Sequence, residues 1–171
     1  MALQNFFLKA LRHGVWVCCS IPLAHADGSA LMPRNVPSAY HQECAACHLA
    51  YPPGMLPAAS WKRILTGLDH HYGTNASVDS ATVVELSHWL QSNARSYKRV
   101  TEEPPQDCIT QSTWFVRKHQ QIDTPVWRLP SVRTAANCAA CHSRADKGVF
   151  DDDHLLYPNG LSQSQRRAWQ D

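Results

Sequence analysis

The sequence has few of the residues that build large apolar cores: only four Phe in 171 residues, against eleven Pro. It also lacks a basic run, and 16 Lys and Arg nearly balance 14 Asp and Glu, so nucleic acid is not an expected partner. The apolar stretch over residues 14–23 is too short to span a bilayer. The length predicts one or two small domains with a modest core.

Residues 1–26 have the pattern of a secretory signal peptide. Lys9 and Arg12 form a positive region, the short apolar stretch follows, and Ala24-His25-Ala26 matches an A-x-A cleavage site. A retained membrane anchor is the less favoured interpretation. Cleavage after Ala26 predicts a periplasmic protein that is not an integral membrane protein, with equal numbers of basic and acidic residues.

One pentapeptide occurs twice and has the pattern C-x-x-C-H, which attaches c-type haem. In each copy the two cysteines form thioether bonds to the haem and the histidine binds the iron. A zinc site would need four ligands converging on one ion, and a redox-active C-x-x-C pair would not need the histidine. We therefore expect two covalently bound haem c groups, whose apolar surface supplements the core. The residues are Cys44, Cys47 and His48 in the first copy, and Cys138, Cys141 and His142 in the second.

Caps and apolar periodicity predict an all-α fold with two small haem-binding units and long irregular loops. The expected helices run from Ser38 to before Pro52, from Ser60 to Gly73, from near Ser80, from Ser112 or Thr113 to Pro125, and from Ser131 to Gly148. Residues 95–105 are polar and end in Pro104-Pro105, which cannot continue a helix. They separate an N-terminal unit, residues 27–104, from a C-terminal unit, residues 105–171.

Each iron needs a second axial ligand. His71 shares an apolar helical face with Ile64 and Leu68, and we favour it for haem 1 over Met55 and His70. His119 shares a face with Phe115 and Ile122, and we favour it for haem 2 over His154. His71 lies 23 residues after His48, and His119 lies 23 residues before His142. This symmetry suggests ligation within each half, and a crossed arrangement stays open.

Several other residues have ordinary interpretations. His41 and His88 are expected on the surface. Cys108 is left without a partner after haem attachment, which favours a simple unpaired thiol over an intermolecular bridge. The acidic run over residues 151–153 is expected to be a solvated tail, because three adjacent carboxylates cannot converge on one calcium ion.

The motifs together resemble a known family. They are residues 40–54 (YHQECAACHLAYPPG), Ser60-Trp61, residues 71–76 (HYGTNA), Thr113-Trp114-Phe115 with His119, and residues 136–142 (ANCAACH). This combination closely resembles the bacterial dihaem cytochrome c family DHC, over residues 36–152. Cys108 and the segment 152–154 are departures from that pattern, which suggest a local interface.

The resemblance implies a mostly helical periplasmic protein with two low-potential haems, each bound by two histidines, and it places the family's histidines on His71 and His119. It also implies electron transfer, with a membrane b-type cytochrome as donor and a small monohaem cytochrome, of the sphaeroides haem protein type, as acceptor.

These features favour an electron carrier that is not an enzyme, because iron with six ligands has no open position for substrate. One alternative is a dihaem redox subunit of a larger periplasmic reductase. A small haem enzyme such as a peroxidase is less favoured, because it needs an exchangeable distal site with acid–base groups beside it.

Overall fold

The computed structural model describes residues 31–94, 100 and 102–169. The predicted signal peptide, residues 1–26, and half of the predicted linker lie outside the described residues. The fold is all-α, as predicted, with helices α1 (Ala58–Thr66), α2 (Ser80–Asn93), α3 (Thr113–Lys118) and α4 (Gln163–Ala168). Short 3-10 turns and long irregular segments join them, and the described ranges contain no strand. Within those ranges no helix is long and apolar enough to cross a membrane.

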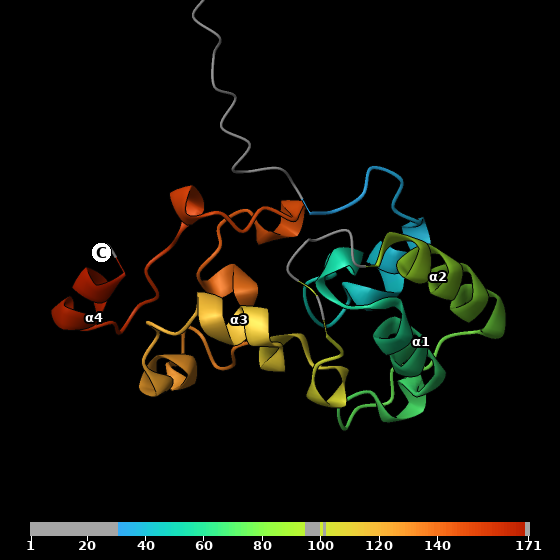
Figure 1. The fold of residues 1–171 in the computed structure, drawn as a ribbon, viewed down its shortest axis with the longest axis horizontal. Coiled ribbons are helices and arrows are strands. Elements are labelled where there is room, and N and C mark those ends of the chain that lie inside the picture. Colours follow the sequence, from blue (N-terminus) through green and yellow to red (C-terminus); the bar gives the residue numbers. More distant parts are fainter. Residues whose placement is uncertain (1–30, 95–99, 101, 170–171) are drawn as a thin grey trace, which may run out of the picture.

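The N-terminal half has its core between α1 and α2, which pack side by side at one end of the molecule (Figure 1). Each helix contributes one apolar stripe with i, i+4 spacing: Trp61 with Leu65, and Leu86 with Leu90. Tyr40 and Leu56 complete this core from the segments before α1. The Trp61 indole N–H donates to the carbonyl of Pro53 at 2.7 Å, which ties the proline-rich loop to α1.

Two helices begin at capped residues. The side chain of Asp79 accepts hydrogen bonds from the backbone N–H groups of Ala81 and Thr82, so α2 begins at Ser80. The hydroxyl of Ser112 accepts from the backbone N–H of Phe115 and caps α3, as one of the two predicted caps. These caps satisfy backbone donors that a helix end would otherwise leave free.

The helix predicted from Ser60 to Gly73 was wrong at both ends. The observed helix, α1, begins at Ala58 after Pro57, whose fixed φ suits a helix start, and Ser60 is fully buried inside it. It ends at Thr66, with Gly67 following, rather than at Gly73. A separate 3-10 turn, Leu68–His70, then leads to His71. Because the helical period stops there, Tyr72 is 57% exposed and does not share the apolar face.

The helices predicted around the two pentapeptides were also wrong. The first is helical only to Cys44, in a π-helical turn over Tyr40–Cys44. The helix predicted over residues 131–148 is replaced by 3-10 turns at Cys138–Ala140 and Ala145–Lys147. Arg133 has a left-handed φ of 71°, which interrupts any continuous helix there. The helix predicted to reach Pro125 ends at Lys118, and a new 3-10 turn spans Thr124–Arg128.

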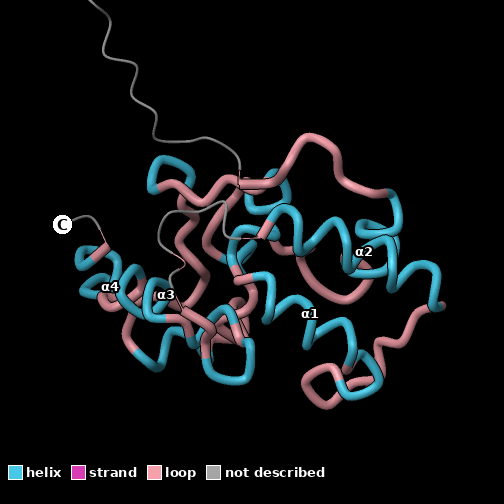
Figure 2. The backbone as a smooth tube through the Cα atoms, turned by 45° about the vertical axis from the view of Figure 1, so that its right-hand side comes forward, coloured by secondary structure: helices cyan, strands magenta, loops and turns pink. Residues whose placement is uncertain are grey.

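The two halves interlock at several points, and α3 and α4 lie at the other end of the molecule from α1 and α2 (Figures 1 and 2). Arg63 on α1 donates two hydrogen bonds to the carboxylate of Asp107, at 2.6 and 2.8 Å, and one to Glu103 at 2.7 Å. The backbone N–H of Leu31 donates to the carbonyl of Gly148 at 2.8 Å. Gly148 permits this approach, because a Cβ there would lie 2.8 Å from the nitrogen of Met32. The boundary between residues 104 and 105 stays a prediction.

Candidate haem-binding sites

The structure brings His48 and His71 together, as site 1. Their imidazole ring centroids lie 6.1 Å apart, and the ring planes differ by 24°. His48 comes directly after the exposed Cys47, beyond the first helical turn. His71 follows the 3-10 turn Leu68–His70, which the end of α1 directs toward the first pentapeptide.

The structure also brings His119 and His142 together, as site 2. Their ring centroids lie 6.2 Å apart, and the ring planes differ by 83°. His119 is the C-cap residue that directly follows α3, and Ser112 caps the other end of the same short helix. His142 closes the second pentapeptide. Each pair of rings therefore comes from a single half of the chain, and ligation within each half stays a prediction.

The spacing of both pairs fits an iron held between two imidazoles. Two metal–nitrogen bonds of about 2 Å each, plus the distance from each nitrogen to its ring centre, give a centroid separation of about 6 Å. Rings bound on opposite sides of one iron can take any angle about their shared axis, so 24° and 83° are both compatible with it.

In two of the histidines, Nδ1 forms a hydrogen bond, which leaves Nε2 available to bind iron. Nδ1 of His48 lies 2.7 Å from the carbonyl of Leu49, and Nδ1 of His119 lies 2.9 Å from the carbonyl of Phe115. A carbonyl only accepts, so each Nδ1 carries the proton and each Nε2 has a free lone pair. Nδ1 of His142 is buried and has no hydrogen-bond partner among the described residues.

Three of these histidines sit where the neutral ring is favoured. Burial lowers the pKa of His71, and the charge of His48 lowers it further. Burial likewise lowers the pKa of His119 and of His142. Neutral imidazole is the form that binds a metal, so these rings are ready for iron at neutral pH.

The cysteines fit thioether attachment better than thiolate chemistry. Burial, assisted by Glu43, raises the pKa of Cys44 to about 11, and burial raises the pKa of Cys138 to about 11. A reactive dithiol needs a lowered thiol pKa, which neither of these cysteines has. Within the described ranges, no group of three or more His, Cys, Asp or Glu side chains could hold a metal ion. Cys108 is half-buried, and its sulfur lies 3.3 Å from the hydroxyl of Thr110.

Aromatic rings surround both histidine pairs. At site 1, Tyr51 lies 5.1 Å from His48 and Tyr72 lies 4.9 Å from His71, between ring centroids. At site 2, three rings lie 4.0–5.8 Å from a histidine: Phe115 and Trp127 beside His119, and Phe150 beside His142. Sequence reasoning missed Trp127 and Phe150 as site residues. Tyr51 lies three residues after His48, in one of the motifs that resemble the dihaem family.

The remaining candidate ligands lie elsewhere. His41, His70 and His88 are exposed, as is expected of surface histidines. Met55 is 3% exposed and is packed within the proline-rich loop.

Asp152 and Asp153 are exposed, as predicted, whereas Asp151 and His154 are half-buried and do not belong to a solvated tail. Nδ1 of His154 is 2.5 Å from a carboxylate oxygen of Asp151, and its Nε2 is 3.0 Å from a guanidinium nitrogen of Arg144. The backbone around it pairs with the second pentapeptide: the N–H of Ser143 donates to the carbonyl of His154 at 3.0 Å, and the N–H of Leu156 to that of Cys141 at 2.7 Å. These bonds hold the chain beyond residue 150 against site 2.

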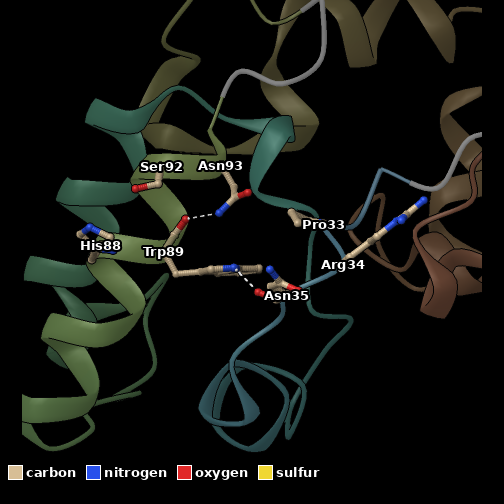
Figure 3. Close-up of a pocket in the computed structure, with 7 residues that line it drawn as sticks. All are labelled: Pro33, Arg34, Asn35, His88, Trp89, Ser92 and Asn93. Carbon is tan, nitrogen blue, oxygen red and sulfur yellow. Dashed lines mark hydrogen bonds between the residues drawn. The ribbon is translucent and has the colours of Figure 1, made fainter.

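A groove of about 350 Å³ lies between residues 33–35 and α2, and none of the predicted site residues lines it. The Trp89 indole N–H donates across it to the carbonyl of Asn35 at 2.7 Å, while Arg34 extends away from α2 (Figure 3). The same indole packs on Tyr40, with ring centroids 4.8 Å apart. The contacts in this groove attach residues 33–35 to the N-terminal core.

The comparisons with known proteins agree with this geometry. Residues 40–150 match the family described as dihaem cytochrome c, DHC. A dihaem cytochrome c structure from Shewanella baltica OS155 is 35% identical with a TM-score of 0.64, over 72% of this chain and 96% of that one. A DHC structure from Rhodobacter sphaeroides is 34% identical with a TM-score of 0.59, over 68% and 98%. No curated protein sequence matches. The chain therefore belongs to the dihaem cytochrome c family, as an electron-transfer cytochrome with two haem c groups.

Proposed function

We propose that the protein transfers single electrons between redox proteins in the periplasm through two low-spin haems, each bound by two histidines. His48 and His71 would hold the first iron, and His119 and His142 the second. One observation carries this proposal: both pairs have the ring separation of axial ligands on one iron, 6.1 and 6.2 Å. The cysteines of the two pentapeptides would attach the haems.

This arrangement suits electron transfer rather than catalysis. Haem bound at these sites would supply one-electron chemistry, and two histidines would hold each iron, which would leave no open position for a substrate. Two imidazoles, rather than an imidazole and a Met thioether, favour a low reduction potential. The aromatic rings beside the histidines pack against the imidazoles and would help to orient them. Met55, the alternative ligand at site 1, is buried within the proline-rich loop.

The location and the partners rest on the sequence. Residues 1–26 carry the features of a secretory signal, with cleavage after Ala26, which supports a periplasmic site of action. By resemblance, the donor would be a membrane b-type cytochrome and the acceptor a small monohaem cytochrome. Docking would be weak and transient, as is usual for redox partners. A stable stoichiometric partner on purification would instead indicate a subunit of a larger reductase.

Binding of external ligands to the matured holoprotein tests whether both irons already have two protein ligands. Cyanide is added to the oxidised protein and CO to the reduced protein, and the absorption spectrum is followed. The proposal predicts no prompt change, because each iron already has two protein ligands. A prompt shift of the bands of either haem would contradict the proposal and direct attention to a haem enzyme such as a peroxidase.

A further inference from the structure

The side chain of Tyr51 reaches from one haem-binding site to the other. Its ring stacks on His48, with centroids 5.1 Å apart and planes 26° apart. Its hydroxyl donates a hydrogen bond of 2.8 Å to the backbone carbonyl of Ala136. Ala136 lies two residues before Cys138, the first attachment residue of site 2. One side chain thus contacts an axial ligand of site 1 and the attachment loop of site 2.

The position of Tyr51 is fixed from several sides. The hydroxyl of Tyr40, itself 2% exposed, donates to the backbone carbonyl of Tyr51. Pro52 and Pro53 follow directly and are fully buried, so the backbone has little freedom there.

Two other contacts between the halves, made by Arg63 and Tyr72, do not join the two sites in this way. Arg63 binds Glu103 and Asp107, which belong to neither pentapeptide. The hydroxyl of Tyr72 also crosses between the halves, but it donates to the carbonyls of Gln106 and Asp107, at 3.2 and 3.0 Å. These contacts hold the halves together without touching the attachment loop of site 2.

We propose that Tyr51 is the positioning residue that couples the two haem sites. Its ring orients His48, its hydroxyl holds the loop that carries Cys138, and together they set how the two haems face each other. Electron exchange between the haems then depends on this one side chain. The inference rests on the proposed histidine ligation and adds to it a residue that binds neither iron.

Two variants separate the roles of the ring and the hydroxyl. Tyr51→Phe keeps the stacked ring and removes the hydrogen bond to Ala136, whereas Tyr51→Leu removes both. Tyr157→Phe is the matched control, because Tyr157 is 39% exposed and stacks on Trp169 rather than on a histidine. The measurement is NMR of the holoprotein: the shifted haem methyl resonances of the oxidised form, and exchange between the haems in half-reduced samples.

For Tyr51→Phe we expect the methyl resonances of haem 2 to shift while those of haem 1 stay in place, although Tyr51 belongs to the first half. Exchange between the haems should slow. Tyr51→Leu should shift the resonances of both haems, and Tyr157→Phe should shift neither.

The proposal would be overturned if haem 2 does not respond to Tyr51→Phe, or if Tyr157→Phe shifts it equally. The parent spectrum is a separate check. Failure to find two low-spin haems there would overturn the histidine ligation itself, whereas two low-spin haems with an unresponsive haem 2 would overturn only the role of Tyr51.

Discussion

The imidazole planes of His48 and His71 lie 24° apart, whereas those of His119 and His142 lie 83° apart. The relative orientation of two axial imidazoles sets the splitting of the iron d orbitals, so a near-parallel and a near-perpendicular pair give different low-spin EPR signals. We expect two distinct signals from the oxidised holoprotein, the more anisotropic one from site 2. Two identical signals would contradict the difference between the pairs.

The cap of α3 should affect site 2 specifically. Ser112 is buried and caps the short helix α3, which His119 follows directly. Ser112→Ala should lower the free energy of unfolding by about 1 kcal/mol and broaden the EPR signal of the His119–His142 pair. Ser162→Ala is the control, because Ser162 caps α4 in a capping box, and α4 carries neither a predicted iron ligand nor an attachment cysteine. An equal spectral change in both variants would mean that the helix cap does not position His119.

The segment beyond residue 150 should protect the second pentapeptide. Truncation after Phe150 removes the carbonyl of His154, which accepts from the N–H of Ser143, and we expect faster hydrogen exchange at Ser143. Truncation after Leu161 keeps this pairing and removes α4, so exchange at Ser143 should stay slow. Unchanged exchange in the shorter chain would show that this segment does not hold site 2.

The ion pair between Arg63 and Asp107 should make the association of the halves dependent on pH and salt. Hydrogen bonds from Arg63 lower the pKa of Asp107 below its ordinary value. The folded carboxyl then binds protons less tightly than the unfolded one, whose pKa is about 4. The pair therefore stabilises the fold above that pKa, and its contribution is lost as the pH falls through the folded pKa.

Asp107→Asn should thus lower the thermal midpoint at pH 7, less so in high salt, and weaken the loss of stability in acid. Asp153→Asn, at an exposed position, should change neither the midpoint nor its acid dependence. If the thermal midpoint of Asp107→Asn equals that of the parent at low salt, the ion pair does not stabilise the fold.

The sequence alone predicts the attachment residues, because the C-x-x-C-H pattern is local and chemically specific. It also pointed to His71 and His119, although the helical reasoning was only partly sound. α1 ends at Thr66, so His71 reaches His48 through a 3-10 turn rather than from the face of a helix. Their role as ligands stays a prediction.

Other features depend on contacts between distant segments, and no local pattern signals them. The bond from Tyr51 to Ala136 joins residues 85 positions apart. The acidic run after Phe150 looked like a solvated tail because its composition is polar. The contacts of His154 with Asp151 and Arg144, which help to hold this segment against site 2, appear only in the structure. The helix predicted over residues 131–148 failed because the backbone of Arg133 turns left-handed, which composition does not reveal.

The most direct test of two irons bound by histidine pairs is low-temperature EPR of the oxidised, periplasmically matured protein beside His71→Ala and His119→Ala. We expect two low-spin signals in the parent, with one lost in each variant: that of the near-parallel pair in His71→Ala and that of the near-perpendicular pair in His119→Ala. A high-spin signal already present in the parent, or the same signal lost in both variants, would contradict the account.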